Sequence, residues 1–120
     1  IAQANGDIIF TTDADCRLPA TWISKTVEQF DEDTHMLVGA VRITGTSFTD
    51  RLQQLEFASL MASGAATLAY HLPTMANGAN LAFRKSSFVL VKGYEGNTHI
   101  PSGDDEFLLL KVVKRYPRGI

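Results

Sequence analysis

Two aspartates follow the first apolar segment of the sequence. Asp13 and Asp15 come shortly after residues 8–10, an uninterrupted apolar run that turn-forming residues precede, so we expect residues 7–12 to form a central strand buried on both faces. Side chains two positions apart on an extended segment point the same way, and both carboxylates could therefore face one hard cation. Oxygen ligands suit Mg²⁺ or Mn²⁺ better than zinc. The spacing equally allows a polar turn in which either aspartate caps the next helix.

A second acidic group lies near the end of the sequence, at Asp104, Asp105 and Glu106. It opens a predicted helix over residues 104–116. Ser102 would cap this helix, and acids in its first turn would interact favourably with the helix dipole. A carboxylate placed there beside a metal could also act as a general base that takes a proton from an attacking hydroxyl. The two interpretations do not exclude each other, because three acids share the turn.

The segments between these acids alternate between strand and helix. Pro19 suits a first helical turn, and Ile23, Val27 and Phe30 recur after it at helical spacing, which predicts a helix whose apolar stripe faces the sheet. Residues 36–43 are rich in β-branched residues around a glycine and predict the next strand. Strands that alternate with helices indicate an α/β layer architecture.

A long helix is predicted next. Ser47 and Asp50 have the spacing of a capping box, and the residues that follow become apolar on nearly all sides toward Tyr70. We expect the apolar half, residues 57–70, to be buried in the core; an interface with a membrane or a neighbouring chain is the alternative. This half is shorter than the ~20 residues that a spanning helix needs, so we do not expect it to cross a membrane.

The last part of the chain contains shorter elements. Residues 77–80 predict a turn, residues 81–83 a strand, residues 87–91 a brief helix and residues 95–103 a loop. His99 lies in that loop, ahead of the second acidic group, and could meet a substrate there.

The composition favours a small ligand over a highly charged polymer. The 120 residues are 45% hydrophobic with a net charge of −2, which predicts one globular unit and gives no electrostatic reason to expect nucleic acid as a partner. Cys16 is the single cysteine, so it forms no internal disulfide, and a reducing cytoplasm is the simplest compartment. Beside hard ligands, a lone cysteine is more often a small buried hydrophobe than a metal ligand.

Three motifs occur in a characteristic order. The first is N-G-D-I-I-F-T-T-D-A-D at residues 5–15. The second is G-A-N-L-A-F-R at residues 78–84, with a G-Y pair further on and Lys92 in place of a preceding glycine. The third is D-D-E-F at residues 104–107. Together they cover nearly all of the chain and resemble the motifs of the family 2 glycosyltransferases.

This resemblance implies a fold and an activity. The fold would be α/β, a three-layer α/β/α GT-A-like (Rossmann-like) arrangement with a mixed sheet, of which residues 1–120 would be the central-to-C-terminal part. The activity would be transfer of a sugar, with inversion, from a nucleotide-diphosphate sugar to a hydroxyl of a glycan or lipid-linked acceptor, assisted by Mg²⁺ or Mn²⁺.

The resemblance also implies what the fragment lacks. The family holds the nucleoside largely on strands that precede the first motif, so we expect residues 1–120 alone to be inactive or nearly so. Membrane association would come only through other parts of the protein, at the cytoplasmic face of a membrane. Unpaired sheet edges would favour a homodimer.

The motifs assign roles to the acids by position. Asp13 and Asp15 would hold the metal and the diphosphate, with Asp15 favoured as the direct metal ligand. Asp105 matches the catalytic base of the family. Asp104 is the second candidate for the base, because the family more often has glutamate at its position.

Other residues are assigned by the same comparison. Asn77, Gly78 and Asn80 would line the acceptor side near the donor sugar; the plain alternative is a turn that enters a strand. Trp22, at helical spacing, is expected to pack within the protein rather than to stack on a sugar.

Three other functions share parts of this pattern. A phosphohydrolase of the haloacid dehalogenase type also places D-x-D after a buried strand, but Cys16 and Arg17 stand where that class has Gly-Thr or similar. A sugar nucleotidyltransferase relies on a glycine-rich, basic loop near its start, which residues 1–120 do not contain. A non-catalytic module that only binds or packs is the third.

Overall fold

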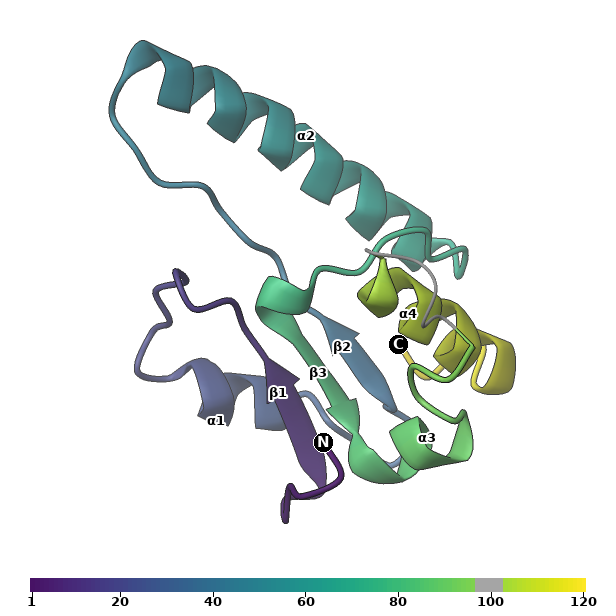
Figure 1. Ribbon diagram of the computed structural model, residues 1–120. Helices are drawn as coiled ribbons and strands as arrows, with labels where there is room; N and C mark the ends of the chain where they lie inside the picture. The colour runs from purple at the N-terminus through teal and green to yellow at the C-terminus, as the bar shows by residue number, and fades with distance from the viewer. Residues whose placement is uncertain (97–102) are drawn as a thin grey trace.

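The computed structural model describes residues 1–96 and 103–120 as a small sheet with helices around it (Figure 1). In chain order the elements are β1 (Ile8–Thr11), α1 (Trp22–Val27), β2 (Met36–Val38), α2 (Phe48–Ala69), the 3₁₀ helix η1 (Gly78–Asn80), β3 (Leu81–Arg84), α3 (Lys85–Leu90) and α4 (Asp104–Arg115). The predicted α/β character is therefore confirmed. The loop predicted for residues 95–103 lies mostly outside the described residues.

The described sheet has three strands in the order β1-β3-β2, and both pairings are antiparallel. β3 is its central strand, and Leu81, Ala82 and Phe83 are all buried. The prediction that residues 7–12 form the central strand is wrong for this sheet, because β1 lies at one edge and is only half-buried. The strand predicted for residues 36–43 ends at Val38.

One face of the sheet carries the main core. Ile9, Phe83 and Met36 are paired across the three strands, so their side chains point to the same face. The apolar side of α4 covers this face and completes a buried cluster of Met36, Leu81, Phe83, Leu108, Leu109 and Val112. The alternation of buried and exposed residues along α4 therefore fixes its orientation against β3.

The opposite face carries α1. Phe10 and Ala82 are paired and share this face, and the ring of Trp22 packs edge-on against Phe10 with 5.2 Å between centroids. Helices thus contact both faces of the sheet, as a layered α/β fold requires. Only antiparallel pairings occur in the described strands, so the predicted mixed sheet is not found there. The three-layer arrangement stays a prediction.

Helix α1 differs from its prediction. It has six residues and none of them is buried. The predicted apolar stripe does not face the sheet, because Ile23 and Val27 are 56% and 44% exposed. The contact with the sheet is made instead by Trp22, the first residue of the helix, which packs within the protein as predicted.

Helix α2 begins as predicted and packs differently. Ser47 and Asp50 form both hydrogen bonds of the capping box. The expected burial of residues 57–70 is wrong, because no residue of α2 is buried and the helix extends away from the sheet in Figure 1. Among the described helices, none has the length and apolar character that crossing a membrane requires.

Helix α4 begins after a glycine. Gly103 is its N-cap residue, with a left-handed φ of 90°, and it supplies no side-chain cap. The predicted cap, Ser102, lies outside the described residues and is not the N-cap. The acids predicted for the first turn are present at Asp104, Asp105 and Glu106.

The packing of α4 predicts a contrast between two leucines of the same helix. Leu108 is fully buried and Leu110 is 56% exposed. We expect Leu108→Ala to lower the free energy of unfolding by about 2–5 kcal/mol, because it leaves a cavity under β3. Leu110→Ala should stay within about 0.5 kcal/mol of the wild type. Urea unfolding followed by circular dichroism measures both, and equal losses would contradict this orientation of α4.

Candidate active site

The D-x-D segment lies at the carboxyl end of β1. Strand pairing ends at Thr11, and the backbone N–H of Cys16 donates to the carbonyl of Asp13 at 3.1 Å, which closes a turn. One ligand atom each from Asp13, Asp15 and Cys16 lies within 4.8 Å of the others. A turn, rather than the expected extended segment, therefore brings the two carboxylates together.

This group has the chemistry of a divalent cation site. Two exposed carboxylates supply hard oxygen ligands, and half-buried Cys16 adds a softer sulfur beside them. The alternative in which Asp13 or Asp15 caps the next helix is not found, because α1 starts at Trp22 and Thr21 is its N-cap residue. The residues that are present thus fit a metal ion.

Asp105 is the acid that points into the structure. Its carboxylate is half-buried in the first turn of α4 and accepts a hydrogen bond from the backbone N–H of Gly78. Burial raises the pKa of this carboxyl, and the negative charges of Asp104 and Asp13 add to the increase, while the Gly78 hydrogen bond opposes it. Asp13, far from Asp105 in the sequence, is therefore near enough in the fold for its charge to act on Asp105.

Gly78 is the junction between the two acidic segments. Its carbonyl accepts a hydrogen bond of 2.7 Å from Thr11 Oγ1, at the end of β1. A Cβ atom on Gly78 would lie 2.4 Å from Oδ2 of Asp105, so the absence of a side chain lets the carboxylate approach the backbone. The turn predicted for residues 77–80 thus sits between the end of β1 and the start of α4.

The other predicted site residues have different surroundings. Oδ1 of Asn77 accepts the N–H of Ala79 at 3.0 Å, within the turn. The amide of Asn80 bonds to Trp22 and to the carbonyl of Ala40. His99 lies outside the described residues. Substrate contacts of these residues stay predictions.

Two further residues lie at the site: Thr11, and Tyr94 of the G-Y pair. Thr11 was not predicted, and its place as the last residue of β1 was the only signal available. Tyr94 lies near Asp105: burial raises the pKa of its hydroxyl, and the charges of Asp105 and Asp104 raise it further. Its ring packs edge-on against Phe88, with 5.2 Å between centroids.

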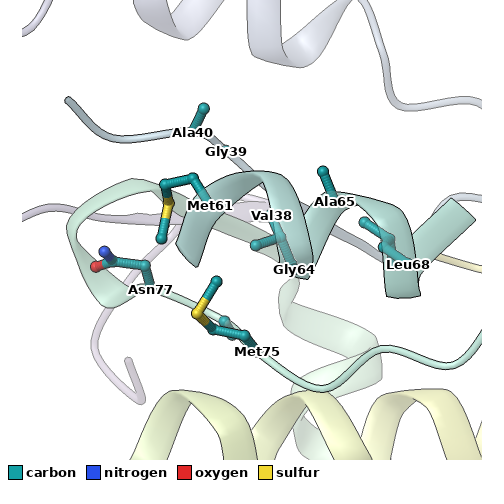
Figure 2. A pocket seen from close by; sticks show the side chains of 10 residues that line it. Val38, Gly39, Ala40, Met61, Gly64, Ala65, Leu68, Met75 and Asn77 are labelled. Carbon is teal, nitrogen blue, oxygen red and sulfur yellow. The ribbon is translucent and has the colours of Figure 1, made fainter. Parts of the chain in front are cut away.

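An apolar pocket of about 110 Å³ lies beside the turn (Figure 2). Its walls come from the end of β2, the second half of α2 and the segment before η1. Met61 and Met75 are two of its larger side chains, Asn77 lies at one end, and none of its lining residues is charged. The pocket therefore reaches Asn77, which directly precedes Gly78, the residue that contacts Asp105.

The raised pKa of Asp105 predicts a stability effect. The folded state holds a proton on this carboxyl more tightly than the unfolded state does, so stability falls as the pH rises from the ordinary pKa of 3.8 through the folded pKa. Asp105→Asn keeps an acceptor for Gly78 and removes the charge. At pH 7 in the presence of a chelator, we expect the melting temperature of this variant to be roughly a few degrees above that of the wild type.

The control for this measurement is pH itself. The gain should disappear below about pH 3.8, where the wild-type carboxyl is protonated in both states. A melting temperature at pH 7 that is lower in the variant than in the wild type would contradict the unfavourable environment of the charge.

Comparison with known proteins identifies a family over a range that ends before α4 and Asp105. The model of the family described as Glycosyl transferase family 2 matches residues 1–90, a range that contains the D-x-D segment and the turn at Gly78. No curated protein and no solved structure matches the chain. The match extends over more than half of the 120 residues. The chain belongs to glycosyl transferase family 2.

Proposed function

We propose that Asp13, Asp15 and Asp105 form the centre of a metal-assisted, inverting transfer of a sugar from a nucleotide-diphosphate sugar to an acceptor hydroxyl. The observation that carries this proposal is the pair of contacts made by Gly78: its carbonyl accepts a hydrogen bond from Thr11, two residues before Asp13, and its backbone N–H donates to the Asp105 carboxylate. A metal pair and a base must lie near the same anomeric carbon, and these contacts of Gly78 support such an arrangement.

Asp105 acts as the general base. Its carboxylate takes the proton of the acceptor hydroxyl while the oxygen forms a bond to the anomeric carbon. The bond from that carbon to the diphosphate breaks, and its electron pair leaves with the diphosphate. A single displacement of this kind inverts the configuration. The raised pKa of Asp105 suits this role, because it makes the carboxylate a stronger proton acceptor.

Asp13 and Asp15 hold the donor side. Their carboxylates would bind Mg²⁺ or Mn²⁺, with Asp15 as the favoured direct ligand, in the turn that Cys16 closes. When bound, such an ion offsets the negative charge that develops on the departing diphosphate. The position of both acids outside the regular strand leaves them exposed to a donor.

The acceptor side is formed by the turn and the pocket. Asn77, Gly78 and Asn80 belong to this turn, and the pocket beside Asn77 has apolar walls without charges. Such walls suit an apolar part of an acceptor better than a diphosphate, which supports a lipid-linked acceptor on this side.

The rest of the domain completes the enzyme. Residues 1–120 are, in this proposal, the central-to-C-terminal part of one GT-A domain, and strands earlier in that domain hold the nucleoside. Transfer is therefore a property of the full-length protein, and residues 1–120 alone should be inactive or nearly so. The tests below use the full-length protein.

Substitution of Asp15 and substitution of Asp105 should impair different steps, donor binding and turnover. Asp15→Ala should lose the Mn²⁺-dependent binding of UDP or GDP, measured by isothermal titration, because the metal loses its direct ligand. Asp105→Asn should bind as the wild type does and turn over about 10²- to 10⁴-fold more slowly, because it lacks the base. Release of nucleoside diphosphate from UDP- and GDP-sugars measures turnover.

Each variant is the control of the other. Normal binding and turnover in Asp15→Ala would remove the metal assignment. Full turnover in Asp105→Asn would move the base elsewhere, with Asp104→Asn as the next variant to measure.

Gly78 predicts a loss of activity without a lost functional group. Gly78→Ala would push the Asp105 carboxylate away, since the added Cβ lies 2.4 Å from Oδ2. We expect turnover to fall by about 10²-fold from this displacement, with Mn²⁺-dependent binding retained. Gly6→Ala is the matched control, because its Cβ would meet only the carbonyl of Ile8 at 3.5 Å. Wild-type turnover in Gly78→Ala would argue against the observed position of the base.

A further inference from the structure

The D-x-D turn has few attachments of its own. Asp13 and Asp15 are exposed, and the hydrogen bond from Cys16 to Asp13 lies within the turn. Helix α1, which follows, buries none of its residues. The hydrogen bond from Thr11 to Gly78 fixes the start of this segment, and its far end needs another contact, because a base and a metal pair act together only at a defined separation.

Trp22 supplies that contact. Its ring packs edge-on against Phe10 of β1, and its indole N–H donates to Oδ1 of Asn80 at 2.9 Å. Among the described residues, this is the only hydrogen bond from α1 to another element. The ring contact limits where the helix lies, and the hydrogen bond fixes how the indole is turned.

Asn80 extends the connection to a third segment. Its Nδ2 donates to the carbonyl of Ala40 at 2.9 Å, and its backbone carbonyl accepts the N–H of Gly39 at 2.8 Å. A Cβ atom on Gly39 would lie 2.1 Å from Nδ2 of Asn80. The side-chain amide of Asn80 therefore packs against the backbone of Gly39, where no side chain is in the way. One amide thus joins α1 to the segment that follows β2.

We propose that Asn80 is a positioning residue: through Trp22 it holds the D-x-D turn in register with the base. Asn80 ends η1, and Gly78, which starts the same short helix, holds Asp105 and Thr11. One short helix therefore contacts the base at one end and the anchor of the metal-binding turn at the other. This inference rests on the proposed function for its effect on donor binding, but not for its effect on the turn itself.

Three variants break the connection in different places. Trp22→Phe keeps a ring against Phe10 and removes the donor. Asn80→Leu keeps a side chain of similar size and removes both hydrogen bonds. Gly39→Ala leaves both partners in place and displaces the amide. The matched control is Thr26→Val, which removes a hydrogen bond of 2.9 Å within α1 and leaves Asn80 untouched.

The first measurement is hydrogen–deuterium exchange in the full-length protein without metal. We expect residues 12–21 to exchange faster in the three variants than in the wild type and in Thr26→Val, with the core of α4 unchanged. A variant that destabilises the whole domain would speed exchange in α4 as well, so the pattern separates positioning from general unfolding. Unchanged exchange of residues 12–21 in all three variants overturns the proposal.

The second measurement is Mn²⁺-dependent binding of UDP or GDP. Each variant should bind about three- to tenfold more weakly than Thr26→Val, the effect of one hydrogen bond. The double variant Trp22→Phe/Asn80→Leu should be no weaker than the weaker single variant, because both changes break one connection. Faster exchange with unchanged binding overturns the link to the donor, whereas absence of binding in the wild type counts against the proposed function.

Discussion

Burial of Leu81 and Phe83 of β3 against α4 is the packing on which the rest of the molecule depends. These two side chains and Met36 form the buried cluster with Leu108, Leu109 and Val112. The same contact positions α4 against the sheet, and the first turn of this helix carries Asp105 to the backbone of Gly78. The core and the candidate active site are therefore not separate: the hydrophobic face of one helix positions the acid at its end.

Features that depend on neighbouring residues could be predicted from the sequence. The strand at residues 8–11, the capping box at Ser47 and the acids at the start of α4 all follow from local patterns, and the structure has each of them. The pairing of β3 between β1 and β2 could not be predicted, because every strand is short and apolar and gives no sign of its partner. The early end of β2 also depends on a distant partner. Gly39 and Ala40 form hydrogen bonds with Asn80, which is forty residues beyond Ala40 in the sequence.

The acids of the candidate site were predicted, whereas the contacts that hold them were not. Their types and motif order are visible in the sequence, but Thr11, Gly78 and Trp22 act through backbone groups or through partners distant in the chain. Helix α2 gives the converse case: its composition predicts burial, yet burial depends on what covers it. Hydropathy measures how readily a segment leaves water and says nothing of the surface that receives it.

The pocket beside Asn77 separates two kinds of evolutionary change. Its walls are mostly aliphatic residues and two methionines, whose flexible side chains adapt to different shapes, and they include none of Asp13, Asp15 and Asp105. If this pocket receives the acceptor, as proposed, substitutions along α2 and the end of β2 can alter which acceptor fits while Asp13, Asp15 and Asp105 stay in place. In a family whose members share one chemistry, a wall of this kind is where a lineage can acquire a new acceptor without first losing its catalyst.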